Sequence, residues 1–180
     1  MKTLLIVDVQ NDFLSGGSLA VPKAEEVIPV INQLMGYFDL VLATKDWHPA
    51  ESNHFEKWPA HCVAETTGAD FPSNLDQDNI DQVFYKGTGK MDDGYSAFEA
   101  TNISIQQFLK ERKINEIYLC GIALEFCVKY SALDALKEGF EVFLLRDAIA
   151  TISTKQEEIE QHYSELKEAG ARIHLSSEFK

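Results

Sequence analysis

The chain has 180 residues, of which 45% are hydrophobic and 25% charged, and its formal net charge is −13. This length and composition predict one globular domain, spanning residues 1–180, with enough apolar residues for a core. The acidic excess disfavours binding to nucleic acid or to an anionic membrane, because both need clustered Lys and Arg. Three cysteines are too few for a disulfide framework, so at least one thiol is free.

The N-terminal sequence gives no sign of a targeting segment. Its apolar run ends at Asp8 and is too short for a signal peptide. No stretch of the sequence approaches the ~20 apolar residues that cross a bilayer. We therefore expect a cytoplasmic protein, in a reducing compartment where a cysteine is more often catalytic, metal-bound or buried than paired.

Short apolar runs alternate with helical patterns along the chain. The runs predict strands that are buried on both faces, and apolar residues at helical spacing predict helices between them. In chain order the elements are strand Thr3–Val9, helix Val27–Phe38, strands Leu40–Ala43 and Val83–Tyr85, helix Ser104–Lys113, strand Ile117–Cys120, helix Phe126–Glu138, strand Val142–Leu145, helix Thr154–Ala169 and strand Ile173–Leu175. A capping box, Thr154-x-x-Glu157, is expected to start the last helix, and Gly139 and Gly170 are expected to end the last two.

This alternation predicts an α/β fold with three layers. We expect a doubly wound sheet of about six parallel strands, in the order 3-2-1-4-5-6, with right-handed crossovers and helices on both faces. Residues 46–80 break the rhythm, because they lack clear periodicity and exceed the usual length of a structureless loop. They contain both tryptophans and three of the five histidines, which disfavours disorder and indicates a functional insertion.

Polar or reactive side chains stand where four of the predicted strands end. Asp8 ends the first strand, Asp46 and His48 follow the second, Lys86 follows the third, and Cys127 opens the helix after the fourth. Ligands bind at this edge of open α/β sheets. A helix N-terminus also lowers a thiol pKa and offers backbone N–H groups to an oxyanion. We predict a nucleophilic cysteine at this edge, although a buried thiol, a capping carboxylate and a solvated lysine are the structural alternatives.

Four potential metal ligands fall within sixteen residues. They are Asp46, His48, His54 and His61, and imidazole with carboxylate suits Zn²⁺, Fe²⁺ or Mn²⁺. No CxxC motif accompanies them, so a zinc finger is disfavoured. The sequence predicts one divalent metal ion in the loop insertion, and polar loop histidines without a metal are the alternative.

Six segments carry a resemblance to a known family. They are LLIVDVQNDFLSGGSLAV (4–21), TKDWHP (44–49), WPAHCV (58–63), FYKG (84–87), YSAF (95–98) and CGIALEFCVKYSALDA (120–135). Together they resemble the nicotinamidase/pyrazinamidase family of the isochorismatase-like cysteine hydrolase superfamily, in the family's order and over most of the chain. The DxH…H set with WPxHC is the specific part of this resemblance.

The resemblance implies a metal-dependent amidohydrolase that converts nicotinamide to nicotinate and ammonia through a thioester, and that also accepts pyrazinamide. Cys127 would attack the carboxamide carbon, Asp8 would move the proton, and Lys86 would hold their charges and depress the thiol pKa. Backbone N–H groups of Ala123 and Cys127 would form the oxyanion hole, with a cis peptide between Ile122 and Ala123.

The resemblance also implies a ligand set and a substrate pocket. Asp46, His48 and His61 would bind the metal, with His54 as a fourth or water-mediated ligand. Zn²⁺ is the first expectation for this metal. The metal would in turn ligate the pyridine nitrogen. Substrate would contact the aromatic residues Phe13, Trp58 and Tyr95 and the backbone at Ala123.

The chain departs from the family at one motif. Where the family commonly has Ala-Thr-Asp-Tyr/His-Cys, residues 123–127 read Ala-Leu-Glu-Phe-Cys, which bears on substrate detail and rate more than on mechanism. A related hydrolase of carbamoyl amines and a non-catalytic metal- or ligand-binding protein are the alternative functions. Isochorismatase chemistry and a thiol-redox role are disfavoured, and the oligomeric state, monomer or homo-oligomer, is left open.

Overall fold

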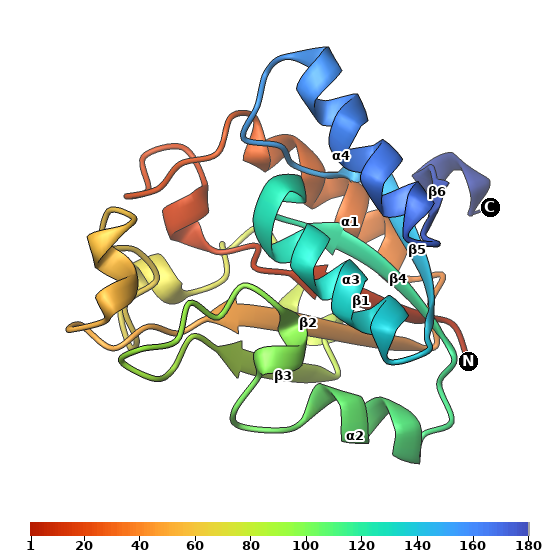
Figure 1. Cartoon of the computed structure of the whole chain (residues 1–180), viewed down its shortest axis with the longest axis horizontal. Coiled ribbons are helices and arrows are strands. Elements are labelled where there is room, and N and C mark those ends of the chain that lie inside the picture. Colours follow the sequence, from red (N-terminus) through yellow and green to blue (C-terminus); the bar gives the residue numbers. More distant parts are fainter. Residues whose placement is uncertain (180) are drawn as a thin grey trace.

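The strands and helices of the computed structural model, which describes residues 1–179, follow the predicted order. Within these residues the sheet consists of β1 (Thr3–Val7), β2 (Leu40–Asp46), β3 (Gln82–Lys86), β4 (Glu116–Gly121), β5 (Glu141–Ile149) and β6 (Arg172–His174). Neighbouring strands are parallel and their order is β3-β2-β1-β4-β5-β6. The predicted doubly wound sheet is therefore confirmed, and β1 and β4 lie side by side at its centre (Figure 1).

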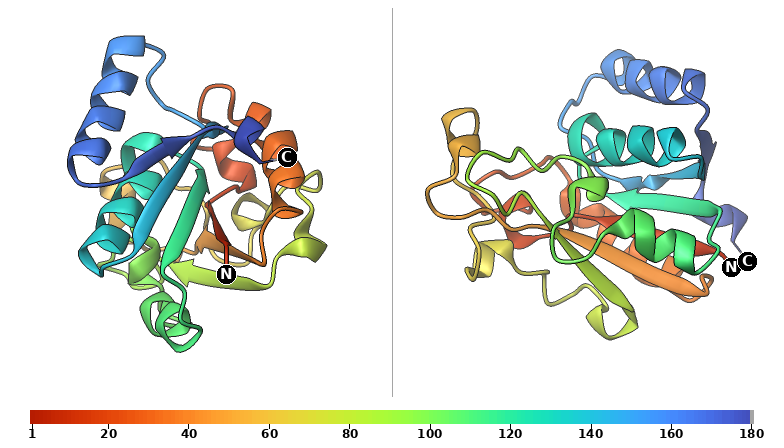
Figure 2. Two further views of the ribbon diagram at one scale, coloured as in Figure 1. Left: turned by 90° about the vertical axis from the view of Figure 1, so that its right-hand side faces the viewer. Right: turned by 60° about the horizontal axis from the view of Figure 1, so that its bottom comes forward.

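Helices cover both faces of this sheet. They are α1 (Val27–Met35), α2 (Ile105–Glu111), α3 (Lys129–Lys137) and α4 (Gln156–Glu168), each shorter than its predicted range. The first lies on one side, and the other three lie on the opposite side (Figure 2). No helix among residues 1–179 is both long enough and apolar enough to span a membrane.

Two ends of helices differ from the expectation. A single π-helical turn, Leu124–Val128, precedes α3, so Cys127 lies in this turn and not in the α-helix. The predicted capping box of α4 is wrong, because the helix starts at Gln156, one residue too late for it. Lys155 is the N-cap residue and its side chain makes no capping bond. The Ser153 hydroxyl accepts from Lys155 N at 3.1 Å, and the Glu125 carboxylate accepts from Ser153 N at 2.9 Å.

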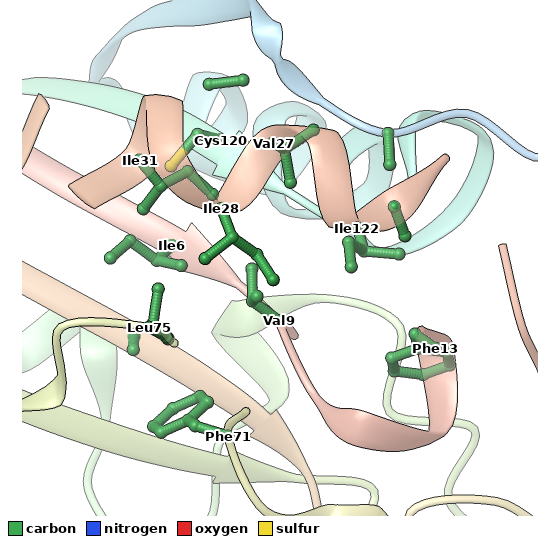
Figure 3. Close-up of a cluster of buried hydrophobic side chains, with 14 of the residues drawn as sticks. Ile6, Val9, Phe13, Val27, Ile28, Ile31, Phe71, Leu75, Cys120 and Ile122 are labelled. Atoms are coloured by element: carbon green, nitrogen blue, oxygen red, sulfur yellow. The ribbon is translucent and has the colours of Figure 1, made fainter. Parts of the chain in front are cut away.

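The alternation of β1 side chains explains the two cores. Leu4 and Ile6 pack in one apolar cluster with α1, whereas Leu5 and Val7 pack in the other with α2, α3 and α4, because successive strand residues point to opposite faces. Figure 3 shows Ile6 below α1, with Phe71 from the loop insertion on the same side of the sheet. A strand buried on both faces thus ends directly at Asp8.

The insertion at 46–80 has little regular structure, as predicted. It contains three single 3₁₀ turns, Asn53–Glu56, Thr67–Ala69 and Gln77–Asn79. Phe71 and Leu75 anchor its second half to the core by burying their side chains. The loops after β1, β2 and β3 gather at one end of the sheet, where the predicted site residues lie (Figure 1).

Candidate active site

Three side chains that lie at or just beyond the ends of three strands meet at the carboxyl edge of the sheet. Lys86, the last residue of β3, places Nζ 2.7 Å from Asp8 Oδ2 and 3.5 Å from Cys127 Sγ. One carboxylate oxygen each of Asp8 and Asp46 and the Cys127 sulfur all lie within 4.8 Å of one another. The structure therefore brings together the three residues that the sequence assigned to one reactive group.

The Lys86 ammonium is fully buried and balanced by two carboxylates. Besides Asp8, it contacts Asp46 Oδ1 at 2.5 Å and donates to the Gly94 carbonyl at 2.7 Å. Burial alone would lower the pKa of Lys86, but the charges of Asp46 and Asp8 outweigh it and hold the pKa well above its usual value. Lys86 is therefore a fixed positive charge between two acids.

Asp8 has an elevated pKa and one carboxylate oxygen, Oδ2, that is ion-paired with Lys86. Burial, reinforced by the charge of Asp46, raises the pKa of Asp8 to about 6 against the opposing effects of Lys86 and Thr44. Thr44 Oγ1 donates to Oδ1 at 2.7 Å. Oδ2 lies 2.7 Å from Lys86 Nζ and has no further hydrogen-bonding partner among residues 1–179. Asp8 is therefore suited to act as a base that ionises near neutral pH and accepts one proton.

Burial and charge act in opposite directions on the Cys127 thiol. The charge of Lys86 lowers the thiol pKa, which is the direction that the resemblance implied, but burial outweighs it and raises the pKa of Cys127 well above its usual value. The two nearby carboxylates act in the same direction as burial, because both favour the neutral form of the sulfur. A base beside the thiol, such as Asp8, would therefore assist the formation of the nucleophile.

Three histidines of the insertion turn one ring nitrogen each toward a common point. These nitrogens of His48, His54 and His61 lie within 4.8 Å of one another. Each Nδ1 faces an oxygen: the Gly87 carbonyl at 3.0 Å from His48, the Asp93 carboxylate at 2.9 Å from His54, and the Pro59 carbonyl at 2.7 Å from His61. With the proton held on Nδ1, each Nε2 is left as a lone-pair donor.

The donor set matches a divalent metal ion. His48 Nε2 is buried and has no hydrogen-bonding partner among the described residues, which is costly unless something binds it. Asp46 Oδ2 lies 3.7 Å from this atom and 4.0 Å from His61 Nε2. Burial opposes ionisation of Asp46, but Lys86 and His48 hold its pKa well below the usual range. Burial also lowers the pKa values of His54 and His61, so neutral imidazoles and a carboxylate face one another.

Gln10 positions Asp46, a role that the sequence did not indicate. Its Oε1 accepts from Asp46 N at 2.8 Å, and its Nε2 donates to the carbonyls of Asp46 at 2.8 Å and Ala69 at 2.9 Å. The side chain is completely buried. A glutamine two residues after a strand-end aspartate was the available signal, but its partners lie 36 and 59 residues away.

A largely apolar cavity of about 100 Å³ opens beside Cys127. The four residues predicted to contact substrate line it, namely Phe13, Trp58, Tyr95 and Ala123, together with residues that the sequence did not indicate, including Phe126 and Ile152. Trp58 Nε1 donates to the Tyr95 hydroxyl at 3.0 Å, and the Phe126 ring meets the Trp58 ring edge-on at 5.0 Å. The Ile122–Ala123 peptide is cis, as the resemblance implied.

Two residues of the departing motif, Leu124 and Glu125, lie outside the pocket. Leu124 is buried in the core and Glu125 does not line the cavity. The Glu125 carboxylate accepts the backbone N–H groups of Ile152 at 3.0 Å and Ser153 at 2.9 Å. Glu125 thereby fixes the loop that carries Ile152 to the edge of the cavity.

Known proteins are similar to this chain in fold and in sequence. A family model described as the isochorismatase domain matches residues 2–176. A nicotinamidase of Acinetobacter baylyi is 40% identical over 173 residues, which cover 83% of this chain and 81% of the relative. Among solved structures, a pyrazinamidase of Pyrococcus horikoshii in complex with zinc is 40% identical with a TM-score of 0.87, covering 97% of this chain and 98% of the other. A yeast nicotinamidase bound to the inhibitor nicotinaldehyde is 31% identical with a TM-score of 0.90, covering 97% and 100%.

Proposed function

Because the chain belongs to the isochorismatase family, we propose that it is an amidohydrolase that converts nicotinamide to nicotinate and ammonia, and that it also accepts pyrazinamide. The observation that carries this function is the convergence of Cys127, Asp8 and Lys86 at the wall of an aromatic cavity. A nucleophile, a base and a fixed charge beside a pocket for a flat ring are what hydrolysis of an aromatic amide requires.

In the first half of the reaction, Asp8 is the base and the Cys127 thiol becomes the nucleophile. Asp8 Oδ2 takes the thiol proton as the Cys127 sulfur forms a bond to the amide carbon, and the carbonyl electrons move onto oxygen. Backbone N–H groups of Ala123 and Cys127 stabilise this oxyanion. The protonated Asp8 then gives its proton to the departing nitrogen, the C–N bond breaks, and ammonia leaves a thioester on Cys127.

Water completes the cycle through the same groups. Asp8, again ionised, removes a proton from water as its oxygen attacks the thioester carbon. The C–S bond breaks, Asp8 returns its proton to the sulfur, and the acid leaves and loses its remaining proton to solvent as nicotinate. Lys86 stays charged throughout and stabilises whichever of Asp8 and Cys127 carries the negative charge, which is consistent with its contacts to both.

We propose that the metal site consists of Asp46, His48, His54 and His61 and that zinc is the metal. The convergent ring nitrogens, the unpartnered Nε2 of His48 and the nitrogen–oxygen donor set support this site. A divalent ion bound there would supply a Lewis acid for the pyridine nitrogen and so orient the ring beside Cys127. The histidines also weigh against the carbamoyl-amine alternative, since those enzymes lack the DxH…H set.

The remaining expectations are also proposals. Two apolar clusters that share a single sheet support one domain over residues 1–180. The three free, buried cysteines are consistent with the reducing conditions of the cytoplasm.

Ammonia release tests the function. Nicotinamide, pyrazinamide and a panel of carbamoyl amides are supplied as substrates before and after chelation. We expect turnover of the two aromatic amides and its loss on chelation, whereas turnover of the carbamoyl amides alone would overturn the assignment.

Cys127→Ala tests the nucleophile. The variant should remain folded and bind metal, but its turnover should fall by several orders of magnitude because no thioester can form. Cys120→Ala is the matched control, since Cys120 is also buried but lies on β4 against the Leu5 carbonyl. Wild-type turnover in Cys127→Ala would remove this residue from the mechanism.

A further inference from the structure

The segment after β3, residues 87–94, contacts the loop of residues 46–80 that carries the proposed metal ligands. The Gly87 carbonyl faces His48 Nδ1 at 3.0 Å and the Lys90 carbonyl accepts from Asn53 N at 2.8 Å, while the Gly94 carbonyl accepts from Lys86, the last residue of β3, at 2.7 Å. A Cβ on Gly87 would lie 2.5 Å from the His48 ring, and one on Gly94 would lie 2.3 Å from Gly87 N. Both glycines have positive φ, so this close approach needs glycine.

Asp93 is the one side chain of this segment that contacts a proposed ligand. Its Oδ1 lies 2.9 Å from His54 Nδ1, and its two oxygens accept from Lys57 Nζ at 2.9 and 2.7 Å. The His54 side chain is 3% exposed and that of Asp93 is 34% exposed. The carboxylate therefore connects a surface lysine to a buried imidazole.

His54 differs from the other two histidines in its partner. His48 and His61 each face a neutral backbone carbonyl, whereas His54 faces an anion. An anionic acceptor holds the proton on Nδ1 more firmly, fixes the ring and makes Nε2 a stronger donor. The histidine whose ligand role the sequence left open thus has the strongest support.

We propose that Asp93 is a positioning residue that makes His54 a direct ligand of the divalent metal and so sets the affinity of the site. This inference rests on the metal site proposed above. Outer partners of this kind are worth about 10- to 100-fold in metal affinity, so Asp93→Asn should weaken Zn²⁺ binding by about that factor.

The alternative is that Asp93 only ties the segment to Lys57 at the surface. Lys57→Met separates the two roles, because it removes the lysine while leaving the hydrogen bond to His54. Asp92→Asn is a second control, because Asp92 is the neighbour of Asp93 and its carboxylate accepts from Gly89 N at 3.0 Å inside the segment. We expect both controls to bind Zn²⁺ within about twofold of the wild type.

The experiment measures the Zn²⁺ dissociation constant of metal-free protein by competition with a chromophoric chelator. The Co²⁺-loaded proteins give a second readout, because loss of an imidazole ligand changes the visible absorption of Co²⁺, whereas a loosened surface loop does not. We expect a weaker constant and an altered spectrum only in Asp93→Asn, and Asp93→Glu, which restores the charge, should recover part of the affinity.

Two outcomes overturn the proposal in distinguishable ways. Wild-type protein that binds no Zn²⁺ removes the metal site itself and this inference with it. Tight binding by the wild type with equal binding by Asp93→Asn, or an equal loss in Lys57→Met, removes only the role of Asp93.

Discussion

Replacing Asp8 by asparagine should stabilise the protein while abolishing its activity. The Asp8 side chain is fully buried, and burial raises its pKa from 3.8 to about 6 despite the ion pair with Lys86. A carboxyl whose folded pKa is raised contributes stability that is fully present below the unfolded pKa and is lost as pH rises through the folded pKa. Ionised Asp8 therefore lowers the stability of the folded protein, and the residue is retained because its catalytic role needs the carboxylate.

The magnitude follows from the same two values. At 1.36 kcal/mol per pKa unit, the difference between 3.8 and about 6 corresponds to roughly 3 kcal/mol at pH values above both. Asparagine has nearly the same shape, is neutral, and can present its carbonyl oxygen to Lys86. We expect Asp8→Asn to gain up to about 3 kcal/mol over the wild type at pH 7.5, and the gain to vanish toward pH 4.

Urea unfolding of metal-free wild type and variant at pH 4.5, 6.0 and 7.5 measures this gain. Asp70→Asn is the control, because its side chain is 58% exposed and its substitution should change stability by less than about 0.5 kcal/mol at each pH. The reasoning is refuted if Asp8→Asn is no more stable than wild type at pH 7.5, or if its gain is the same at all three values.

Three further predictions concern activity and metal binding. The kcat/KM of the wild type should rise with pH through about 6, because Asp8 must be ionised to take the thiol proton; a flat profile from pH 5 to 7 would exclude it as the base. His61→Ala should lower bound Zn²⁺ by about tenfold or more after gel filtration, whereas His174→Ala, on β6, should retain it. Glu125→Gln should raise KM for nicotinamide several-fold with a smaller effect on kcat, because it weakens the hydrogen bonds that hold Ile152 at the cavity; equal loss in both parameters would contradict this role.

Local sequence patterns predicted the elements but not all of their ends. The helix begins at Gln156 and not at the predicted capping box, and the segment before it is held by a contact between Ser153 and Glu125, which are 28 residues apart in sequence. Cys127 lies in a π-helical turn that the spacing of apolar residues did not predict. One extra residue in a single turn leaves the apolar spacing of the following helix unchanged, so the sequence pattern carries no signal for it.

The predicted site residues did come together, yet their protonation states did not follow from the sequence. The expected helix N-terminus suggested a lowered thiol pKa at Cys127, but burial, together with the nearby carboxylates, raises it. Gln10 and Asp93 act through partners 36 to 59 residues away, so neither has a local signature.

By itself the sequence determined the order of strands and helices and the sheet edge that carries the candidate reactive groups, and it predicted the types of residue in the proposed nucleophile and metal-ligand sets. It could do so because buried parallel strands appear as short apolar runs and because their carboxyl ends share one edge. Only the tertiary structure decided which nitrogen of each histidine is free and which carboxylate beside Lys86 can accept a proton. It also decided how strongly burial shifts the pKa values of Asp8 and Cys127. Those properties depend on solvent exclusion and on charges brought within a few ångströms by residues distant in sequence, and no local pattern encodes them.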